Sequence, residues 1–306
     1  MRIVFMGTPA FAVPSLDAVA THHEVELVVT QPDRVAGRGT CARPSPVKEA
    51  AERLGIPVFQ QTSLRGESAD VIASASPDVI CVVAFGMLLP PEVLAIPPHG
   101  CVNVHASLLP LYRGAAPIQR SILAGDEETG VSIMLMEAGL DTGPYALQRR
   151  VVIGDRYAEE IEADMATAGA EALLEVLGRI QTGEVSWVPQ DEDRATYAAK
   201  ITKDDVALRP ELSVDEAFRR VRAATRRAPA RACLGDREVT VVRATPVGTA
   251  DAAGGVCLID GAPVLGFSDG GLRLDVLRPA GKGDMSGVDW ARGARLTEDV
   301  CWRCTR

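Results

Sequence analysis

The sequence predicts an α/β protein in which a doubly wound, mostly parallel, Rossmann-like sheet is followed by a small OB-like β-barrel domain. Short apolar strands alternate with helical segments over the first half of the chain, which is typical of a parallel sheet covered by helices. The run Val79–Phe85 is apolar on both faces, as expected at the buried centre of such a sheet. After residue 230 the pattern changes to short strands separated by glycine-rich turns, which indicates a barrel.

The length predicts two domains, because 306 residues is long for a single core. The stretch 190–206 is polar and irregular, so it is the best candidate for a linker. We therefore expect a catalytic domain at 1–189, a linker at 190–206 and a second domain at 207–306.

The composition, with 47% apolar and 24% charged residues, is that of an ordinary globular protein. No apolar run approaches the roughly 20 residues needed to cross a bilayer, and the first residues enter a strand rather than a secretory signal. Seven scattered cysteines, an odd number, favour reduced thiols. We expect a cytoplasmic monomer with no membrane partner.

The charge is uneven along the chain. From Ala207 onward there are 16 Lys/Arg and 13 Asp/Glu, a balance of +3, which leaves −12 for the rest of a chain whose net charge is −9. A basic tail on an acidic body hints at a polyanion partner for the tail, although solubility alone could explain the acidic half.

The chain begins with a strand at Arg2–Met6, a helix from Pro14 to about Thr21 and a second strand at Glu24–Thr30. The turn after the first strand is not a GxGxxG motif, so no dinucleotide is implied. A loop then runs from Gln31 to Pro46, much longer than the usual ~2–6 residues, and this length suggests a function. Its arginines, Arg34, Arg38 and Arg43, could contact phosphates, but a solvated surface loop fits the composition equally well.

The buried strand Val79–Phe85 and the strand that begins at Cys101 should end at the same edge of the sheet, where ligands of such folds bind. The elements expected around them are a helix at Val47–Leu54, a strand at Pro57–Phe59, a helix that ends at Ala75, a helix at Ile118–Leu123, a strand at Thr129–Met136 and a long helix at Glu159–Ile180.

The stretch Cys101–Pro117 carries the chemistry that the other elements surround. Asn103 and His105 are two residues apart on a strand, so their side chains leave the same face. An amide can hold a developing oxyanion, and an imidazole can accept a proton near neutral pH. A polar strand end with a hydrogen-bonded histidine is the simpler explanation of this spacing alone.

Asp141 lies in a turn between Gly139 and Gly143. Its carboxylate could orient His105 through the ring N–H and stabilise the imidazolium. Aspartate and glycine are also common turn residues, so a turn without a catalytic role fits as well.

The carboxy-terminal part is expected to hold a helix with a basic face at Val214–Ala224. Strands are predicted at Glu238–Arg243, Gly255–Ile259, Pro263–Phe267 and Leu272–Leu277. Barrels of the OB kind often bind nucleic acid. The spacing Cys301-Trp302-Arg303-Cys304 has no second ligand pair close by, so ordinary thiols are expected there.

The motifs of the site resemble those of the folate-dependent formyltransferases. The resemblance rests on three stretches: Asn103 to Pro110, Arg113 to Gln119, and Gly139 to Gly143. Further matches to the branch of this family that formylates methionine on initiator tRNA cover essentially the whole length: Phe5 to Pro9, Gln31 to Arg34, Gly37 to Gly39, Pro44 to Lys48, Thr196 to Ala198, Lys200-Ile201, Gly281-Lys282 and Met285.

The resemblance implies a one-carbon transferase that uses 10-formyltetrahydrofolate as co-substrate and initiator methionyl-tRNA as acceptor, for translation initiation. It assigns the catalytic roles to Asn103, His105 and Asp141. The folate contacts are assigned to Ser107, Leu108, Leu109 and Pro110, with Phe85, Gly86, Met87 and Leu88 beside the pterin. No metal is implied, because the formyl group is already activated by its attachment to the folate.

The resemblance also implies that the loop from about Gln31 to Lys48 enters the acceptor end of the tRNA, with Arg34, Arg38 and Arg43 as its contacts. The carboxy-terminal barrel would add a basic surface for the RNA. The chain departs from the family in two places. Thr40-Cys41-Ala42 replaces the usual lysines of the loop, and the turn 226–231 lacks the usual glycine.

Two other functions share these features. A formyltransferase acting on an amino-sugar nucleotide would need the same Asn/His/Asp site but neither the arginine-bearing loop nor a basic barrel. A nucleic-acid-binding protein with an inactive α/β domain is the second alternative, and the intact site argues against it.

Overall fold

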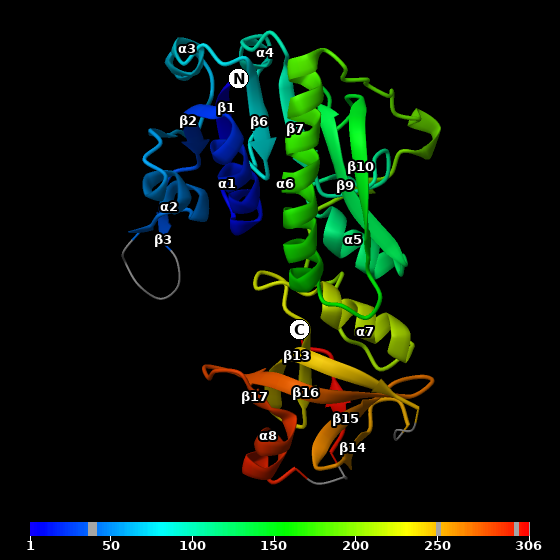
Figure 1. Cartoon of the computed structure of the whole chain (residues 1–306). Helices are drawn as coiled ribbons and strands as arrows, with labels where there is room; N and C mark the ends of the chain where they lie inside the picture. Colours follow the sequence, from blue (N-terminus) through cyan, green and yellow to red (C-terminus); the bar gives the residue numbers. More distant parts are fainter. Residues whose placement is uncertain (36–41, 249–251, 297–299, 306) are drawn as a thin grey trace. The chain divides into compact units, whose positions relative to one another are not determined.

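The computed structural model describes the whole chain except residues 36–41, 249–251, 297–299 and 306, and only the backbone of Arg34 and Val35. The chain divides into two compact units (Figure 1). The first comprises 1–117, 128–152 and 159–198, and the second comprises 118–127, 153–158 and 199–306.

The first unit is built on a mixed seven-stranded sheet. Its strands, in spatial order, are β10 (Tyr145–Val152), β9 (Glu128–Leu135), β7 (Cys101–His105), β6 (Val79–Val83), β1 (Arg2–Gly7), β2 (Glu24–Thr30) and β5 (Val58–Gln60). The five strands from β7 to β5 are mutually parallel, and β9 and β10 continue the sheet as antiparallel strands. The sheet is therefore mostly parallel and doubly wound, as predicted.

Helices cover both faces of this sheet. The described helices of this unit are η1 (Ala10–Ala12), α1 (Val13–His22), α2 (Pro46–Arg53), α3 (Glu67–Ser74), α4 (Pro91–Leu94), α6 (Ala158–Thr182) and η2 (Glu192–Arg194), a single exposed turn. The long helix α6 runs along one face (Figure 1), where Gly169 lies against Val104 of β7 and Val131 of β9. On the opposite face, Val4 and Met6 of β1 share a buried cluster with Ile72 of α3 and Val93 of α4.

The alternation of side chains along β7 decides where the site lies. Val104 faces α6, so Asn103 and His105 face the opposite side, which carries α3 and α4. β6 ends at Val83, earlier than the predicted Phe85, because Ala84 and Gly86 take positive φ angles of 46° and 76°. The chain therefore turns away from the sheet just beside the end of β7.

Two small pairs of strands complete the first unit. β3 (Arg34–Val35) pairs with β4 (Ala42–Arg43) at the base of the loop after β2. β8 (Arg113–Gly114) pairs in parallel with β11 (Tyr197–Ala198), two segments that lie far apart in the sequence. Such two-residue strands carry no periodic pattern, so the sequence did not predict them.

The second unit holds a curled antiparallel sheet in the order β14 (Val256–Ile259), β15 (Ala262–Gly266), β16 (Gly271–Pro279), β13 (Arg237–Val247), β12 (Arg231–Leu234) and β18 (Trp302–Arg303), with β17 (Met285–Ser286) also paired to β16. A bridge between Gly255 and Cys301 joins the two ends of this order. The unit also contains α5 (Pro117–Ala124), whose first residue belongs to the first unit, α7 (Val214–Ala223) and α8 (Gly287–Ala294).

The core of the second unit gathers buried side chains from strands and helices, among them Phe218 of α7, Trp290 of α8 and Trp302 of β18. The helix α7 begins with a capping box in which Ser213 and Glu216 satisfy each other's backbone N–H groups.

The predicted fold class is confirmed, although some elements were missed. The sequence reasoning did not find β10, β12 or α8, and it made β13 too short. β10 alternates poorly, since its residues are mostly half-buried or exposed, and α8 contains two glycines. None of the described helices is long and apolar enough to cross a membrane.

Candidate active site

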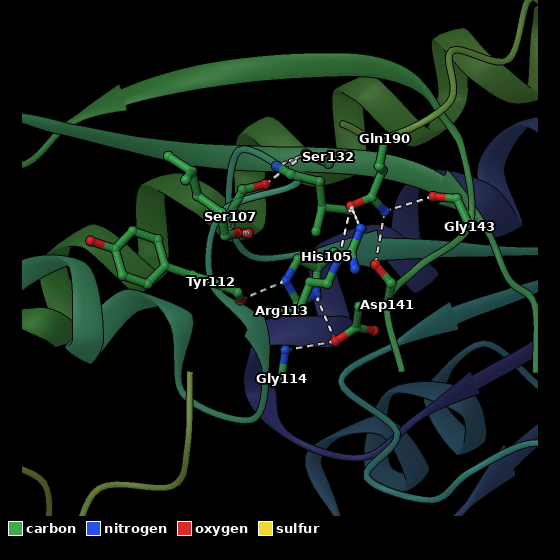
Figure 2. Close-up of polar contacts among 11 residues, drawn as sticks. His105, Ser107, Tyr112, Arg113, Gly114, Ser132, Asp141, Gly143 and Gln190 are labelled. Atoms are coloured by element: carbon green, nitrogen blue, oxygen red, sulfur yellow. Dashed lines mark hydrogen bonds and ion pairs between the residues drawn. The ribbon is translucent and has the colours of Figure 1, made fainter. Parts of the chain in front are cut away.

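His105 lies at the end of β7 and is almost fully buried, with 6% of its side chain exposed. Its Nε2 donates a hydrogen bond to the backbone carbonyl of Tyr112 at 3.1 Å (Figure 2). A carbonyl oxygen can only accept, so Nε2 carries the proton of the neutral ring. Nδ1 is then the nitrogen that can take up a proton, and it faces Oδ2 of Asp141 at 3.6 Å.

Asp141 comes from the loop between β9 and β10. Its Oδ2 accepts a hydrogen bond from the backbone N–H of Gly114 at 2.8 Å, which fixes the carboxylate toward His105. A positive charge on Nδ1 would therefore be balanced by a carboxylate that is already in place. The geometry differs from the predicted contact between Asp141 and the ring N–H, because the N–H on Nε2 is bound by Tyr112 and the carboxylate faces Nδ1.

Asn103 precedes His105 by two residues on the same face of β7, and 9% of it is exposed. On the sheet it is paired with Val82 of β6 and Met134 of β9. Among the residues that the structure describes, no partner binds the Asn103 side-chain amide. A nearly buried amide without a protein partner is available to a substrate oxygen.

A cavity of about 480 Å³ opens beside these residues, on the face of the sheet that carries α3 and α4. Its wall is largely apolar and includes Asp141. The lining residues are Thr62, Ser63, Leu64, Arg65, Met87, Leu88, Leu89, Pro90, Pro91, Met134, Met136, Glu137, Ala138, Gly139, Leu140 and Asp141. The size and the apolar wall suit the ring system of a folate.

The predicted folate contacts separate into two groups. Met87 and Leu88 line the cavity, and Leu88 is 79% exposed at its mouth. Phe85 is buried beside it in the cluster with Met6 and Ile80, and Gly86 makes the turn with positive φ.

The other group is Ser107 to Pro110, which forms the turn after β7. Ser107 and Leu109 are buried, and neither they nor Leu108 and Pro110 line the cavity. The Ser107 hydroxyl donates to the carbonyl of Leu111 at 2.5 Å, which closes the turn.

Ser132 and Gln148 hold this turn in place. The Ser132 hydroxyl donates to the carbonyl of Ser107 at 2.6 Å and accepts from the N–H of Leu109 at 3.0 Å. Gln148 donates to the Ser132 hydroxyl and to the carbonyl of Leu109. The turn that leads from His105 to Tyr112 is thus fixed by Ser132 of β9 (Figure 2) and by Gln148 of β10.

Arg113 and Gln190 form a second support, under the loop that carries Asp141 (Figure 2). Arg113 is completely buried and donates to the Gln190 side chain and to the carboxylate of Glu192. The hydrogen bond to Glu192 raises the pKa of Arg113, and the same contact lowers the pKa of the exposed Glu192 carboxyl. Gln190 and Glu192, which fall in the predicted linker, therefore contact the site.

The predicted RNA contacts lie around the loop after β2. Arg43 is exposed on β4, Arg34 contributes its backbone to β3, and Arg38 lies outside the described residues. The base of this loop is anchored to the site. Lys48 bonds Asp33 at 2.7 Å and Gln60 at 3.0 Å.

The anchor reaches the wall of the cavity. Gln60 donates to the carbonyl of Gln31, whose own side chain donates to the carbonyl of Phe85 at 2.9 Å. Hydrogen bonds from Lys48 and Gln60 lower the pKa of Asp33. The base of the loop, at Gln31, therefore lies directly beside the residues that follow β6.

Several of these residues were missed by sequence reasoning. Ser132 and Gln148 are single polar residues within strands, and the cavity walls 62–65 and 134–140 lack a local motif. Gln190 is 49 residues from Asp141 and 77 residues from Arg113 in the sequence. The one signal in the sequence was Ser132, a hydroxyl in an otherwise apolar stretch of strand. Among the described residues, no cluster of three or more His, Cys, Asp or Glu side chains could hold a metal ion.

An amide and an imidazole–carboxylate pair at the carboxyl end of a parallel strand, beside an apolar cavity, define a group-transfer enzyme on a doubly wound sheet. Two family models cover most of the sequence. Residues 1–177 match the formyl transferase model, and residues 200–295 match that of the formyl transferase C-terminal domain. The chain belongs to the formyl transferase family.

Relatives match along the full length. The chain is 45% identical to the methionyl-tRNA formyltransferase of Halorhodospira halophila over 300 residues, which cover 96% of this chain and 97% of the relative. It is 42% identical to the methionyl-tRNA formyltransferase of Methylobacterium sp. strain 4-46, with 97% of both chains covered.

Solved structures share the fold at low sequence identity. The N-formyltransferase from Helicobacter canadensis, solved with folinic acid and dTDP-3-aminofucose, superposes with a TM-score of 0.69 at 16% identity. The match covers 90% of this chain and 98% of that structure.

Proposed function

We propose that this enzyme transfers the formyl group of 10-formyltetrahydrofolate to the α-amino group of methionine carried by initiator tRNA. The product is N-formylmethionyl-tRNA, the aminoacyl-tRNA that starts translation. Full-length relatives that carry the name of this activity support the choice of acceptor. Membership of the formyl transferase family supports the folate donor.

The observation that carries the proposal is the position of Asp141. Asp141 lines the cavity, and its carboxylate faces Nδ1 of His105 at 3.6 Å. A reactive group of a ligand that reaches Asp141 in this cavity would therefore lie beside the imidazole–carboxylate pair. Formyl transfer to an amine needs a proton acceptor at that point.

The proposed chemistry uses each of the three residues in turn. The neutral amine of the methionyl ester attacks the formyl carbon, and the carbonyl oxygen becomes negative in the tetrahedral intermediate. The Asn103 amide stabilises that oxyanion. The attacking nitrogen becomes positive and loses its proton to Nδ1 of His105, and Asp141 balances the resulting imidazolium. Collapse of the intermediate then breaks the bond between the carbon and the folate nitrogen, and the His105 imidazolium returns its proton to that nitrogen, so that tetrahydrofolate leaves and the imidazole is neutral again.

The folate is proposed to lie in the 480 Å³ cavity. Met87, Leu88 and Met134 supply apolar contact for its rings, and the backbone of Glu137 to Leu140 supplies polar groups for their edges. Ser107 to Pro110 do not line the cavity, and we propose that they support this site through the turn that they form.

The RNA is proposed to contact the loop from Gln31 to Lys48, through Arg34, Arg38 and Arg43, and the barrel of the second unit. We further propose a monomeric cytoplasmic protein with a catalytic domain at 1–189, a linker at 190–206 and an RNA-binding domain at 207–306.

The test is formylation with matched acceptors. The purified chain is incubated with 10-formyltetrahydrofolate and one of three acceptors: methionyl initiator tRNA, methionyl elongator tRNA or an amino-sugar nucleotide. We expect formylmethionine on the initiator tRNA at a rate far above the other two acceptors. Transfer mainly to the sugar nucleotide would favour the sugar formyltransferase, and binding of RNA without any transfer would favour an inactive binding protein.

A further inference from the structure

Arg113 is a charged side chain with no exposed surface, and it stands among the largest completely buried residues of the chain. Its Nε and Nη2 both donate to Oε1 of Gln190, at 3.0 and 2.8 Å. Its Nη1 and Nη2 also form a two-pronged contact with the carboxylate of Glu192, at 2.9 and 2.7 Å. A buried guanidinium is retained where its planar fork holds a particular geometry.

The Arg113 guanidinium fixes the orientation of the Gln190 side-chain amide. Arg113 can only donate, so it fixes the oxygen of this amide toward itself and turns the NH₂ group the other way. That NH₂ group donates to the backbone carbonyls of Asp141 at 2.8 Å and Gly143 at 2.7 Å. Both amide hydrogens are thereby used on the loop that carries the catalytic carboxylate (Figure 2).

This loop needs such a support because its backbone is unusual. Asp141 has a φ of +54°, in the left-handed region that residues with a Cβ rarely adopt. Two residues later, a Cβ on Gly143 would lie 1.8 Å from the carbonyl oxygen of Leu135, so the chain passes too close to β9 for any side chain. Conformations of this kind persist where neighbouring contacts determine them.

Arg113 also acts through its place on β8. The next residue, Gly114, donates its backbone N–H to Oδ2 of Asp141, while Gln190 binds the backbone carbonyl of the same aspartate. Both ends of Asp141 are therefore positioned by β8. Gly114 binds the carboxylate directly, and Arg113 holds Gln190, which binds the backbone carbonyl. The carbonyl of Tyr112, just before Arg113, accepts a hydrogen bond from the ring N–H of His105.

We propose that Arg113 and Gln190 are positioning residues that set the placement of Asp141 against His105. The inference rests on the proposed function, because the placement matters for proton transfer during formylation. Neither residue lines the cavity, so the role is exerted through Asp141 and not through the folate.

The sharpest variant is Gln190→Glu. It keeps an oxygen for Arg113 and adds a carboxylate to neutralise it, so the buried guanidinium stays paired. It removes both donors to Asp141 and Gly143 and sets a negative oxygen against their carbonyls. We expect a fall in kcat of roughly 10- to 100-fold, a part of the ~10²–10⁴ that a general base contributes. The KM for 10-formyltetrahydrofolate should stay within about threefold of wild type.

Gln181→Glu is the matched control, since it makes the same chemical change at an exposed position near the end of α6. Its kcat should equal that of wild type. Arg113→Lys is the second variant. A lysine keeps the charge but cannot give two parallel hydrogen bonds to Gln190, so a fall in kcat in the same direction is expected. If Gln190→Glu does not fold, Arg113→Lys takes its place in the test.

A spectroscopic readout separates positioning from general weakening of the fold. The ¹⁵N NMR signals of the His105 ring are assigned by their loss in His105→Asn. In Gln190→Glu the Nδ1 signal should shift, because its carboxylate neighbour has moved, and the Nε2 signal should stay, because Tyr112 has not.

The inference is overturned if kcat of the folded variant stays within about twofold of Gln181→Glu, or if the Nδ1 signal is unchanged. The NMR readout needs no substrate. A wild-type protein that formylates no acceptor would therefore refute the proposed function and leave the positioning claim to be decided by Nδ1.

Discussion

The orientation of the His105 ring is set by two neighbours, a neutral carbonyl at one ring nitrogen and a negatively charged carboxylate at the other. The Tyr112 carbonyl accepts a hydrogen bond from the N–H on Nε2, and the Asp141 carboxylate lies beside Nδ1. The ring is thereby held in one tautomer with its basic nitrogen toward the carboxylate, which is the orientation that a proton acceptor needs. In the proposed mechanism, Asn103 on the same strand supplies the complementary group, a donor for a negative oxygen.

The first prediction concerns that donor. Asn103→Ala should lower kcat by about 10²–10³, because the amide acts chiefly on the oxyanion of the transition state. The KM values for folate and tRNA should change little. Steady-state kinetics with both substrates provide the measurement, and a kcat within about threefold of wild type would remove Asn103 from this role.

A second residue-scale prediction concerns Ser132, which is buried and bonds to the turn after β7. Ser132→Ala leaves the Ser107 carbonyl and the Leu109 N–H without this partner, so we expect a loss of about 1–3 kcal/mol in the free energy of unfolding. Urea denaturation measures this directly. Ser74→Ala is a suitable control, since the Ser74 hydroxyl is exposed and bonds only within α3. Equal stability of the two variants would contradict the role given to Ser132.

Among the helices and strands, the sequence predicted those with a periodic residue pattern. It missed the short pairs of strands that are held by a few contacts between distant residues. Strand and helix alternation gave the parallel sheet, and the spacing of Asn103 and His105 gave their common face. The resemblance to a family supplied the partners. The pairing of β8 with β11 could not be predicted, because each strand has two residues and the pair joins 113–114 to 197–198.

The site shows the same division between local and distant information. Met87 and Leu88 follow β6 and could be placed at the end of that strand, and both line the cavity. Thr62 to Arg65 reach the same cavity from another connection without any motif. The carbonyl that binds His105 belongs to Tyr112, and its place depends on a backbone turn with φ of +59°. Patterns of residue type do not carry such backbone detail.

A prediction at this scale concerns the contact between α5 and the segment before α7. Burial raises the pKa of Asp205, but hydrogen bonds from Arg120 and Thr202 outweigh burial and lower that pKa from 3.8 to about 2. Because the pKa in the folded state is the lower one, the carboxylate stabilises the fold above its ordinary pKa. This stabilisation is lost as the pH falls from about 3.8 to about 2.

Asp205→Asn should therefore unfold at lower urea than wild type at pH 7, and the difference between the two should shrink as the pH falls through that window. Asp204→Asn is the matched control, because the neighbouring Asp204 side chain is 93% exposed. A gap between Asp205→Asn and wild type that stays constant down to pH 2.5 would contradict the lowered pKa.

At the scale of the whole molecule, charge is divided along the chain, with −12 before residue 207 and +3 after it. An acidic catalytic body would repel RNA, so contact there depends on local cations near the site. The loop after β2 carries three arginines, Arg34, Arg38 and Arg43, and its base is hydrogen-bonded to Phe85 through Gln31.

Arg43 is the loop arginine whose exposed side chain the structure describes. Arg43→Ala should lower kcat/KM for charged initiator tRNA and make its salt dependence shallower by about one unit of log–log slope. The KM for folate should not change. Arg150→Ala, at a side chain that is 74% exposed, is the control for loss of a surface charge. Identical salt slopes for Arg43→Ala and Arg150→Ala would contradict contact between this loop and the RNA.

The central claim is that His105, held between Tyr112 and Asp141, accepts the proton of the attacking amine. The most direct test is the single-turnover rate of formyl transfer to methionyl initiator tRNA by His105→Asn. Asparagine keeps a polar side chain at this position, but it has no nitrogen that accepts a proton at neutral pH. We predict a fall of about 10²–10⁴ in the rate with folate affinity retained. A rate within about threefold of wild type would contradict the account.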